Sequence, residues 1–345
     1  MRQSELAERS GLSAKHINQI TTETIGITGD VAVALERALD IPAGFWTRAE
    51  ADYQAYVGEV RARQKFTTYI GWMRKFDSVT LERHQIVSAA DDAVTRVDKL
   101  LRFFGVANPA AFDQTWMRPK TSFRRSQAFT VHEENTALWL RLVDLTASKV
   151  ETADYTPSAL RRAIKALPRL TTLSVTHGFA AARQELAEAG IALTFVREIP
   201  NTRVCSATWW LDSGRPAIGL TARYRRPDSF WFNIAHELAH ITLHPKRSTF
   251  LNLDAEKKLR EPAEAEADEW AENTLVLAAA REQLAHATSK TDLVRIAAAA
   301  GVGVAIIAGQ WARLRNTQTA WAAANDLRGQ ITDQEIEELE SLTDT

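Results

Sequence analysis

The sequence predicts a multidomain chain in which an all-α helix-turn-helix domain and a helical connector precede an α+β domain with a small sheet. Short helical segments broken by glycine and proline fill residues 1–60, and long helical patterns with few breakers fill residues 61–165. Runs rich in β-branched and aromatic residues begin within residues 166–325, and an acidic tail is expected over residues 326–345. At 345 residues, 45% apolar and 25% charged, the chain is a globular protein with room for several domains.

The composition also indicates the cellular compartment in which the protein resides. No apolar run is long enough to cross a membrane, and the N-terminus carries no signal-peptide pattern. The single cysteine, Cys205, fits a reducing compartment. We therefore expect a cytoplasmic protein without disulfides.

Residues 3–20 have the spacing of a helix-turn-helix. The small Ala7 allows two helices to approach, Gly11 suits a turn with positive φ, and Ser13 is placed to cap the second helix. The expected shared core consists of Leu6, Leu12, Ile17 and Ile20. This pattern predicts two short helices joined by a tight turn.

The segment resembles the XRE, or Cro/C1-type, repressor domain, and in particular the HigA-like antitoxin regulators. The resemblance implies operator DNA as a partner and a homodimer. It places six residues in the helix that would enter the major groove: Ser13, Ala14, Lys15, His16, Asn18 and Gln19. That family has a helix before the one at Gln3, so we expect a misassigned or truncated start, or an incomplete module.

Charge leaves a second reading of this domain open. Residues 1–60 carry five Lys and Arg against nine Asp and Glu, a net −4, which weakens attraction to phosphates. A helix-turn-helix used only for protein contacts is the alternative. Residues 61–130 carry thirteen against six, a net +7, which indicates either phosphate binding or a solvated helix face.

Regular elements are expected on both sides of the chain's centre. Helices are predicted around residues 81–104, 135–150 and 180–189, and strands at 191–196, 204–211 and 216–221. A helix is predicted over residues 230–244, with Asp228 or Ser229 as its N-cap, and another over 261–280.

The segment His236-Glu237-Leu238-Ala239-His240 carries the chemistry of a catalytic metal site. Histidines four residues apart share one helical face and can bind one Zn²⁺, while Glu237 is placed to act on a water. A closed structural zinc site is usually rich in cysteine and has no use for such a carboxylate. The pentad therefore predicts a zinc-dependent hydrolase in which Glu237 is the general base.

A third ligand is needed, and several residues could supply it. On the second helix Glu264 and Asp268 share a face, so Glu264 can bind metal while Asp268 orients a ligand histidine. Glu266 competes with Glu264. His244 is a further alternative, although three imidazoles at successive turns fit poorly around one ion.

Residues 232–240, His244-Pro245 and the stretch from Glu264 to Ala271 resemble the ImmA/IrrE-type metallopeptidases found beside or fused to bacterial repressors. The resemblance covers roughly residues 170–280 and implies a zincin-like metallopeptidase domain within residues 166–325, with Glu264 as third ligand. It implies a zinc endopeptidase that cuts itself or a partner repressor in stress, toxin–antitoxin or mobile-element control. Tyr224, a neighbouring arginine or His177 could stabilise the oxyanion.

Two other functions stay open. The first is a non-proteolytic, HigA-like antitoxin or transcription regulator in which the zinc site is structural or sensory. The second is a binding module whose C-terminal half grips a toxin. Glu237 argues against the first, since metal binding alone does not require it.

Overall fold

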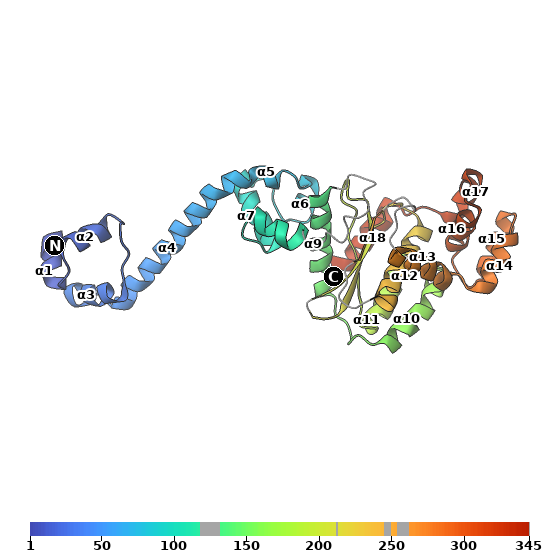
Figure 1. Cartoon of the computed structure of the whole chain (residues 1–345), viewed down its shortest axis with the longest axis horizontal. Coiled ribbons are helices and arrows are strands. Elements are labelled where there is room, and N and C mark those ends of the chain that lie inside the picture. The colour runs from blue at the N-terminus through green and yellow to red at the C-terminus, as the bar shows by residue number, and fades with distance from the viewer. Residues whose placement is uncertain (118–131, 212, 245–249, 254–261, 345) are drawn as a thin grey trace. The chain divides into compact units, whose positions relative to one another are not determined.

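The computed structural model describes residues 1–117, 132–211, 213–244, 250–253 and 262–344 (Figure 1). The chain forms two compact units, Met1–Met73 with Ile86–Phe103, and Arg74–Gln85 with Phe104–Thr345. Among the described residues, no helix combines the length and apolar character needed to cross a membrane.

The first unit begins with the predicted helix-turn-helix. Helix α1 (Gln3–Ser10) ends at Gly11, whose φ of 73° is the left-handed conformation that glycine adopts without strain. Ser13 caps α2 (Ala14–Thr21) by accepting a hydrogen bond from the amide of His16. Ala7 and Ile17 are buried where α1 and α2 meet.

Two longer helices follow in the same unit. Helix α3 (Gly29–Leu39) buries four apolar residues, and α4 (Ala43–Phe66) packs beside it. Because α4 runs through residue 60 without a break, the boundary expected there does not coincide with the end of an element. The unit continues through η1 (Thr67–Tyr69), α5 (Ile70–Met73) and α7, which spans Ala93–Phe104.

The single helix expected around residues 81–104 is wrong. Helix α6 (Ser78–Arg83) ends first, because Gln85 takes a φ of 55°, which a right-handed helix cannot contain. Helix α7 starts anew with Asp92, whose carboxylate accepts a hydrogen bond from the amide of Thr95.

The second unit contains a four-stranded mixed sheet in the order β1-β3-β2-β4. Strand β1 (Ala192–Phe195) is parallel to β3 (Pro216–Leu220), while β2 (Val204–Trp210) is antiparallel to both β3 and β4 (Phe250–Leu253). Three of these strands match the predicted ranges to within about a residue. Sequence analysis missed β4, a four-residue strand that depends on β2 for its pairing.

Helices cover both faces of the sheet (Figure 1). Helix α9 (Glu133–Lys149) lies on one face, where Gly219 leaves room for Val143 and Trp139. Helices α11 (Val175–Glu188) and α12 (Pro227–Leu243) lie on the other face with α10 (Pro157–Leu170) beside them. Although α9 was expected in the connector, it therefore packs as part of the sheet unit.

Eight further helical segments complete the described part of the second unit. They are α8 (Pro109–Phe112), η2 (Asp113–Met117), α13 (Pro262–Leu275), α14 (Ala278–His286), α15 (Lys290–Ala300), α16 (Val304–Arg315), α17 (Gln318–Arg328) and α18 (Asp333–Asp344). Among them, α13 and α16 pack directly on α12.

The acidic C-terminus differs from the expected solvated tail. Helix α18 buries Ile336 and Leu339 in the core, and the Thr343 hydroxyl donates to the carbonyl of Phe195 at 3.0 Å. The carboxylates that suggested a tail occupy one side of an amphipathic helix, and the apolar residues between them pack on the sheet unit.

Candidate metal centre

The metal helix α12 begins earlier than the sequence predicted. Pro227 occupies its first turn, where the missing amide hydrogen costs nothing, and Arg226 stands at the N-cap position instead of Asp228 or Ser229. The helix is largely surrounded by other elements, so His236, Glu237 and His240 are at most 2% exposed. These polar side chains need partners inside the protein.

Three ligand atoms converge beside this helix. The Nε2 atoms of His236 and His240 lie 3.1 Å apart, and the Glu264 carboxylate lies 3.1 Å from the first and 3.5 Å from the second. All three atoms lie within 4.8 Å of one another. Tetrahedral Zn²⁺ with bonds of about 2.0–2.1 Å separates its ligand atoms by about 3.3–3.4 Å, so the arrangement fits such an ion.

The competing third ligands lie outside this cluster. Glu266 contacts His244 at 3.3 Å and its side chain is 61% exposed. The Nδ1 of His244 lies 2.9 Å from Nδ1 of His240, on the ring edge opposite the cluster. Glu264 is the carboxylate that α13 brings to both imidazoles.

The outer edges of both imidazoles are also held. Asp268 Oδ1 lies 3.0 Å from Nδ1 of His236, and His244 takes the corresponding place at His240. The ring of Phe250 on β4 stacks on His240 with centroids 4.0 Å apart. Contacts at Nδ1 favour imidazole orientations in which Nε2 faces the cluster.

Glu237 is fully buried, and its polar neighbours Ser206 and Thr208 both come from strand β2. Its Oε2 accepts a 2.6 Å hydrogen bond from the hydroxyl of Thr208 on β2. Its Oε1 has no hydrogen-bond partner among the described residues. An orphaned buried oxygen is costly, and a water bound at the cluster would satisfy it.

Burial and charge act in opposite directions on the two glutamates. Burial raises the pKa of Glu237 despite the nearby His236 and His240. Burial alone would also raise the pKa of Glu264, but its hydrogen bonds to the two histidines and their charge outweigh it and hold that pKa well below its usual range. Glu264 therefore stays ionised as a ligand must.

With this geometry in view, comparison with known families is decisive for two parts of the chain. Residues 197–311 match the IrrE N-terminal-like domain, a peptidase family. Residues 1–46 match the helix-turn-helix model. The predicted arrangement, an N-terminal helix-turn-helix followed by an ImmA/IrrE-type segment, is thereby confirmed. No curated protein is significantly similar to the chain.

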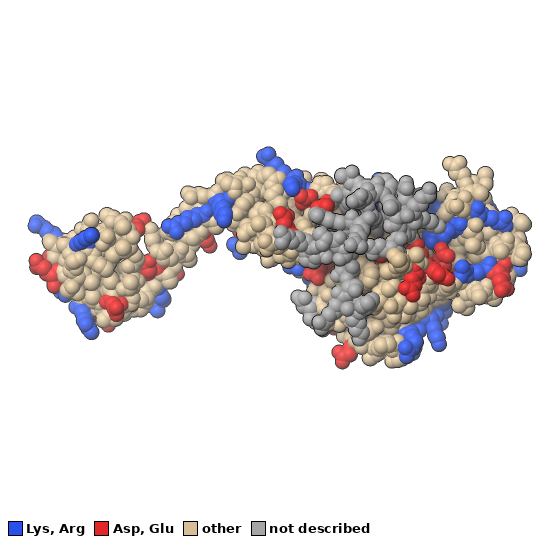
Figure 2. All heavy atoms as spheres, in the orientation of Figure 1, with Lys and Arg blue, Asp and Glu red and all other residues tan. Residues whose placement is uncertain are grey.

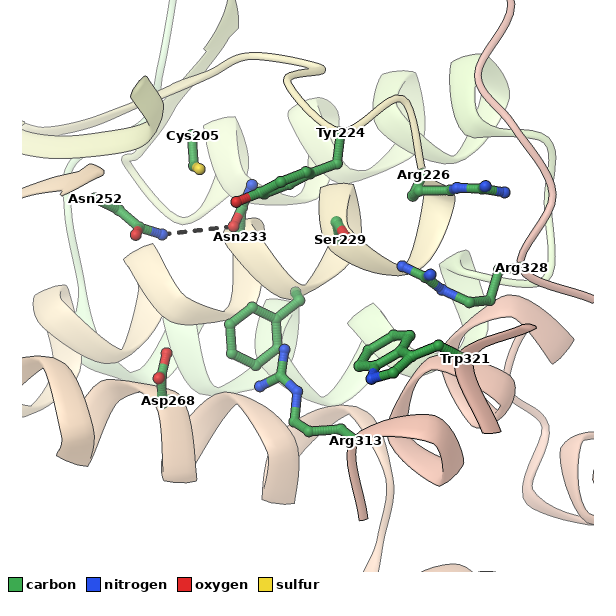
Figure 3. A pocket seen from close by; sticks show the side chains of 11 residues that line it. Cys205, Tyr224, Arg226, Ser229, Asn233, Asn252, Asp268, Arg313, Trp321 and Arg328 are labelled. Carbon is green, nitrogen blue, oxygen red and sulfur yellow. Dashed lines mark hydrogen bonds between the residues drawn. The ribbon is translucent and has the colours of Figure 1, made fainter. Parts of the chain in front are cut away.

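A cleft of about 360 Å³ lies beside the IrrE-like centre (Figure 3). Asp268 and Asn233 line it near the metal cluster, and Arg226 and Arg328 line it near the first turn of α12. Tyr224, predicted as an oxyanion group, also lines this cleft. His177 does not line it, and its Nδ1 lies 2.7 Å from the hydroxyl of Ser174.

In the helix-turn-helix match, the predicted DNA-contacting residues lie on or next to α2. Ser13, Ala14, Lys15 and Asn18 are exposed, whereas His16 and Gln19 are half-buried. Lys and Arg are interspersed with Asp and Glu on the visible face of this unit (Figure 2). Their contacts to DNA stay predictions. Within the basic stretch 61–130, Arg118, Lys120, Arg124 and Arg125 lie outside the described residues, and so does Pro245.

Sequence reasoning missed Thr208, Phe250, Arg313 and Arg328. Thr208 and Phe250 belong to strands, and their neighbours are set by pairing across the sheet rather than by local spacing. Arg313 and Arg328 come from helices far along the chain. An isolated threonine or arginine carries no motif that would have singled it out.

Proposed function

We propose that the chain is a DNA-binding transcriptional regulator whose C-terminal domain is a zinc-dependent endopeptidase. The observation that carries this proposal is the convergence of His236, His240 and Glu264 beside the orphaned Oε1 of Glu237. A site that only stabilises the fold needs the three ligands, but it does not need a buried carboxylate with one oxygen free. The family matches support both halves of the proposal.

In this site each residue has a distinct task. His236, His240 and Glu264 would hold Zn²⁺, which when bound lowers the pKa of water and polarises a carbonyl. Glu237 would accept a proton from the attacking water through Oε1 and return it to the leaving amine. Thr208 would keep the other oxygen in place, and Asp268 would orient His236.

Strand β4 suggests how a substrate is presented. It has no neighbour beyond it in the described sheet, and Phe250 stacks directly on His240. An extended peptide adding to this edge would pass over the metal cluster, with backbone hydrogen bonds supplying affinity. We infer that the substrate is a regulatory protein, the chain itself or a partner repressor, in stress, toxin–antitoxin or mobile-element control.

The N-terminal domain would direct this activity to an operator. Exposed Lys15 and Asn18 on α2 are the side chains best placed for phosphate and base contact. Replacing Lys15 with Ala should weaken binding to all sequences and reduce its salt dependence, whereas Asn18→Ala should relax preference for one base pair. Equal DNA affinity of both variants and the parent would support the protein-contact alternative.

The central experiment compares the parent with Glu237→Gln. Zinc content is measured by mass spectrometry, and cleavage of the chain itself and of candidate repressors is followed by intact-mass analysis. Both proteins should bind one zinc, and only the parent should cut; chelation of the metal should abolish its cleavage. If neither cuts and both repress a promoter alike, the non-proteolytic regulator is the correct reading.

A further inference from the structure

The cleft beside the metal centre carries a concentration of positive charge. Three arginines line it, Arg226, Arg313 and Arg328, and Asp268 is the carboxylate among its lining residues (Figure 3). Asp268 is itself engaged with His236. We refer to the end of the cleft formed by these arginines, with Phe232 and Trp321, as the arginine pocket.

Among the described residues, part of this positive charge has no acidic partner. Glu272 pairs with Arg313 at 2.9 Å and Asp228 pairs with Arg328 at 2.8 Å. Arg226 binds the carbonyl of Gly329 and the amide oxygen of Asn325, which are uncharged acceptors. In the described part of the chain, the arginine pocket therefore holds three guanidinium groups against two paired carboxylates.

The arginines also keep donors available. Arg313 uses Nη1 for Glu272, and Arg328 uses Nε for Asp228. The other guanidinium nitrogens of these two side chains have no hydrogen-bond partner among the residues that the structure describes. A guanidinium with unused N–H groups is suited to accept a carboxylate in a planar, two-bonded arrangement.

Aromatic rings lie against two of these guanidinium groups. Arg313 lies 4.4 Å from the centroid of Phe232, and Arg328 lies 4.7 Å from that of Trp321. Such contacts limit the motion of the two side chains. The pocket is thus organised before a ligand arrives, which lowers the entropic cost of binding.

The position of the pocket relates it to the peptide path. Phe232 lies one helical turn before His236, with ring centroids 6.1 Å apart, and Asp268 lines the same cleft. A peptide held at the metal cluster would place a neighbouring side chain toward Arg313. We propose that the arginine pocket is a specificity subsite for an acidic side chain, Asp or Glu, of the peptide substrate; this rests on the proposed peptidase function.

The first test is the cleavage preference of the full-length, zinc-loaded chain. A proteome-derived peptide library is digested, and the cut sites are aligned by mass spectrometry. Asp and Glu should be enriched at one fixed position relative to the scissile bond. Cut sites without acidic enrichment at any position would overturn the proposal.

The second test assigns the preference to the pocket. Matched peptides with Glu or Gln at the enriched position are compared for the parent, Arg313→Gln, Arg226→Gln and the control Arg295→Gln, whose side chain is 67% exposed on α15. In Arg313→Gln the Glu-over-Gln ratio of kcat/KM should fall about tenfold, and it should also fall in Arg226→Gln, while Arg295→Gln should keep the parent ratio. An unchanged ratio in both variants refutes the assignment.

A binding measurement separates this proposal from the peptidase function. Fluorescence anisotropy follows binding of a labelled Ala-Ala-Glu-Ala-Glu-Ala-Ala peptide and its Gln counterpart to the Glu237→Gln chain. Tighter binding of the Glu peptide, lost in the double variant with Arg313→Gln, supports the subsite even if the parent cuts nothing. Equal binding of the two peptides contradicts the subsite even if the parent is an active peptidase.

Discussion

The hydroxyl of Thr208 donates a 2.6 Å hydrogen bond to Oε2 of Glu237, so strand β2 holds one oxygen of the buried carboxylate on the metal helix. This bond leaves Oε1 as the oxygen without a partner among the described residues. The sheet therefore holds Oε2 of Glu237 in place and leaves Oε1 available to a water at the metal cluster.

We expect the Thr208→Val variant to bind zinc like the parent but to cleave its substrate with a lower kcat. The valine has nearly the same shape but cannot donate, so Glu237 would sample several orientations and kcat should fall about tenfold or more. Zinc stoichiometry should stay at the parent value, since Thr208 contacts none of the three ligands. Thr208→Ser, which keeps the hydroxyl, is the control, and equal kcat in Thr208→Val and the parent would contradict the positioning role.

Asp268 should govern metal affinity through His236. Replacement by Asn removes the charge next to Nδ1, and loss of such an outer contact commonly costs about 10–100-fold in metal affinity. Competition with a chromophoric chelator measures this change directly. Glu269→Gln on the same helix, where the side chain is exposed, provides the matched control and should leave the affinity within about twofold. Similar losses in both variants would assign the effect to general charge instead.

The site could be predicted from sequence where its geometry is local. His236, Glu237 and His240 lie within two turns of one helix, so their spacing alone places both imidazoles on one face. Glu264 was harder, because α13 offers Glu264, Glu266 and Asp268 at similar spacing. Only the packing of α13 on α12 shows which carboxylate meets the histidines. The role of Thr208 could not be predicted from the sequence, since its position beside Glu237 depends on pairing across the sheet.

The same distinction applies to the fold. Gly11 and Ser13 predicted the helix-turn-helix because their roles depend on adjacent backbone atoms. The acidic residues of α18 suggested a tail, and the burial of Ile336 and Leu339 between them depends on a sheet unit more than a hundred residues earlier. Features that depend on adjacent residues could be predicted from the sequence. The tertiary packing that buries one side of a helix could not.

Gly219 should test whether α9 is an integral part of the sheet unit. A Cβ at this position would lie 2.3 Å from Cγ1 of Val143 and 3.1 Å from the ring of Trp139. Gly219→Ala should therefore lower the free energy of unfolding by about 1–3 kcal/mol through overpacking. Chemical denaturation of the full chain, followed by tryptophan fluorescence, measures the change.

A double variant makes this prediction specific. Val143→Ala removes the methyl groups that the new Cβ would strike, so the cost of Gly219→Ala should be smaller in that background. The coupling free energy of the two substitutions should then be at least about 0.5 kcal/mol. Strict additivity would show that α9 does not press on the sheet at this position.

Glu50 should make the stability of the N-terminal unit depend on pH. Its carboxylate accepts a 3.0 Å hydrogen bond from the amide of Ile27, and this bond, followed by one from Gln54, lowers the pKa of Glu50 below its ordinary 4.5. A carboxylate with a lowered folded pKa stabilises the native state above its unfolded pKa, and the benefit disappears as pH falls through the folded pKa.

At pH 7 the parent should therefore melt at a higher temperature than Glu50→Gln. Below about pH 4 the difference should shrink, because the protonated carboxyl resembles the amide. Gln54→Ala removes only the smaller of the two contributions. At pH 7 its melting temperature should therefore fall below that of the parent by less than the melting temperature of Glu50→Gln does. A gap that stays constant from pH 7 to pH 3 would show that the charge of Glu50 contributes nothing to the stability of the turn at Ile27.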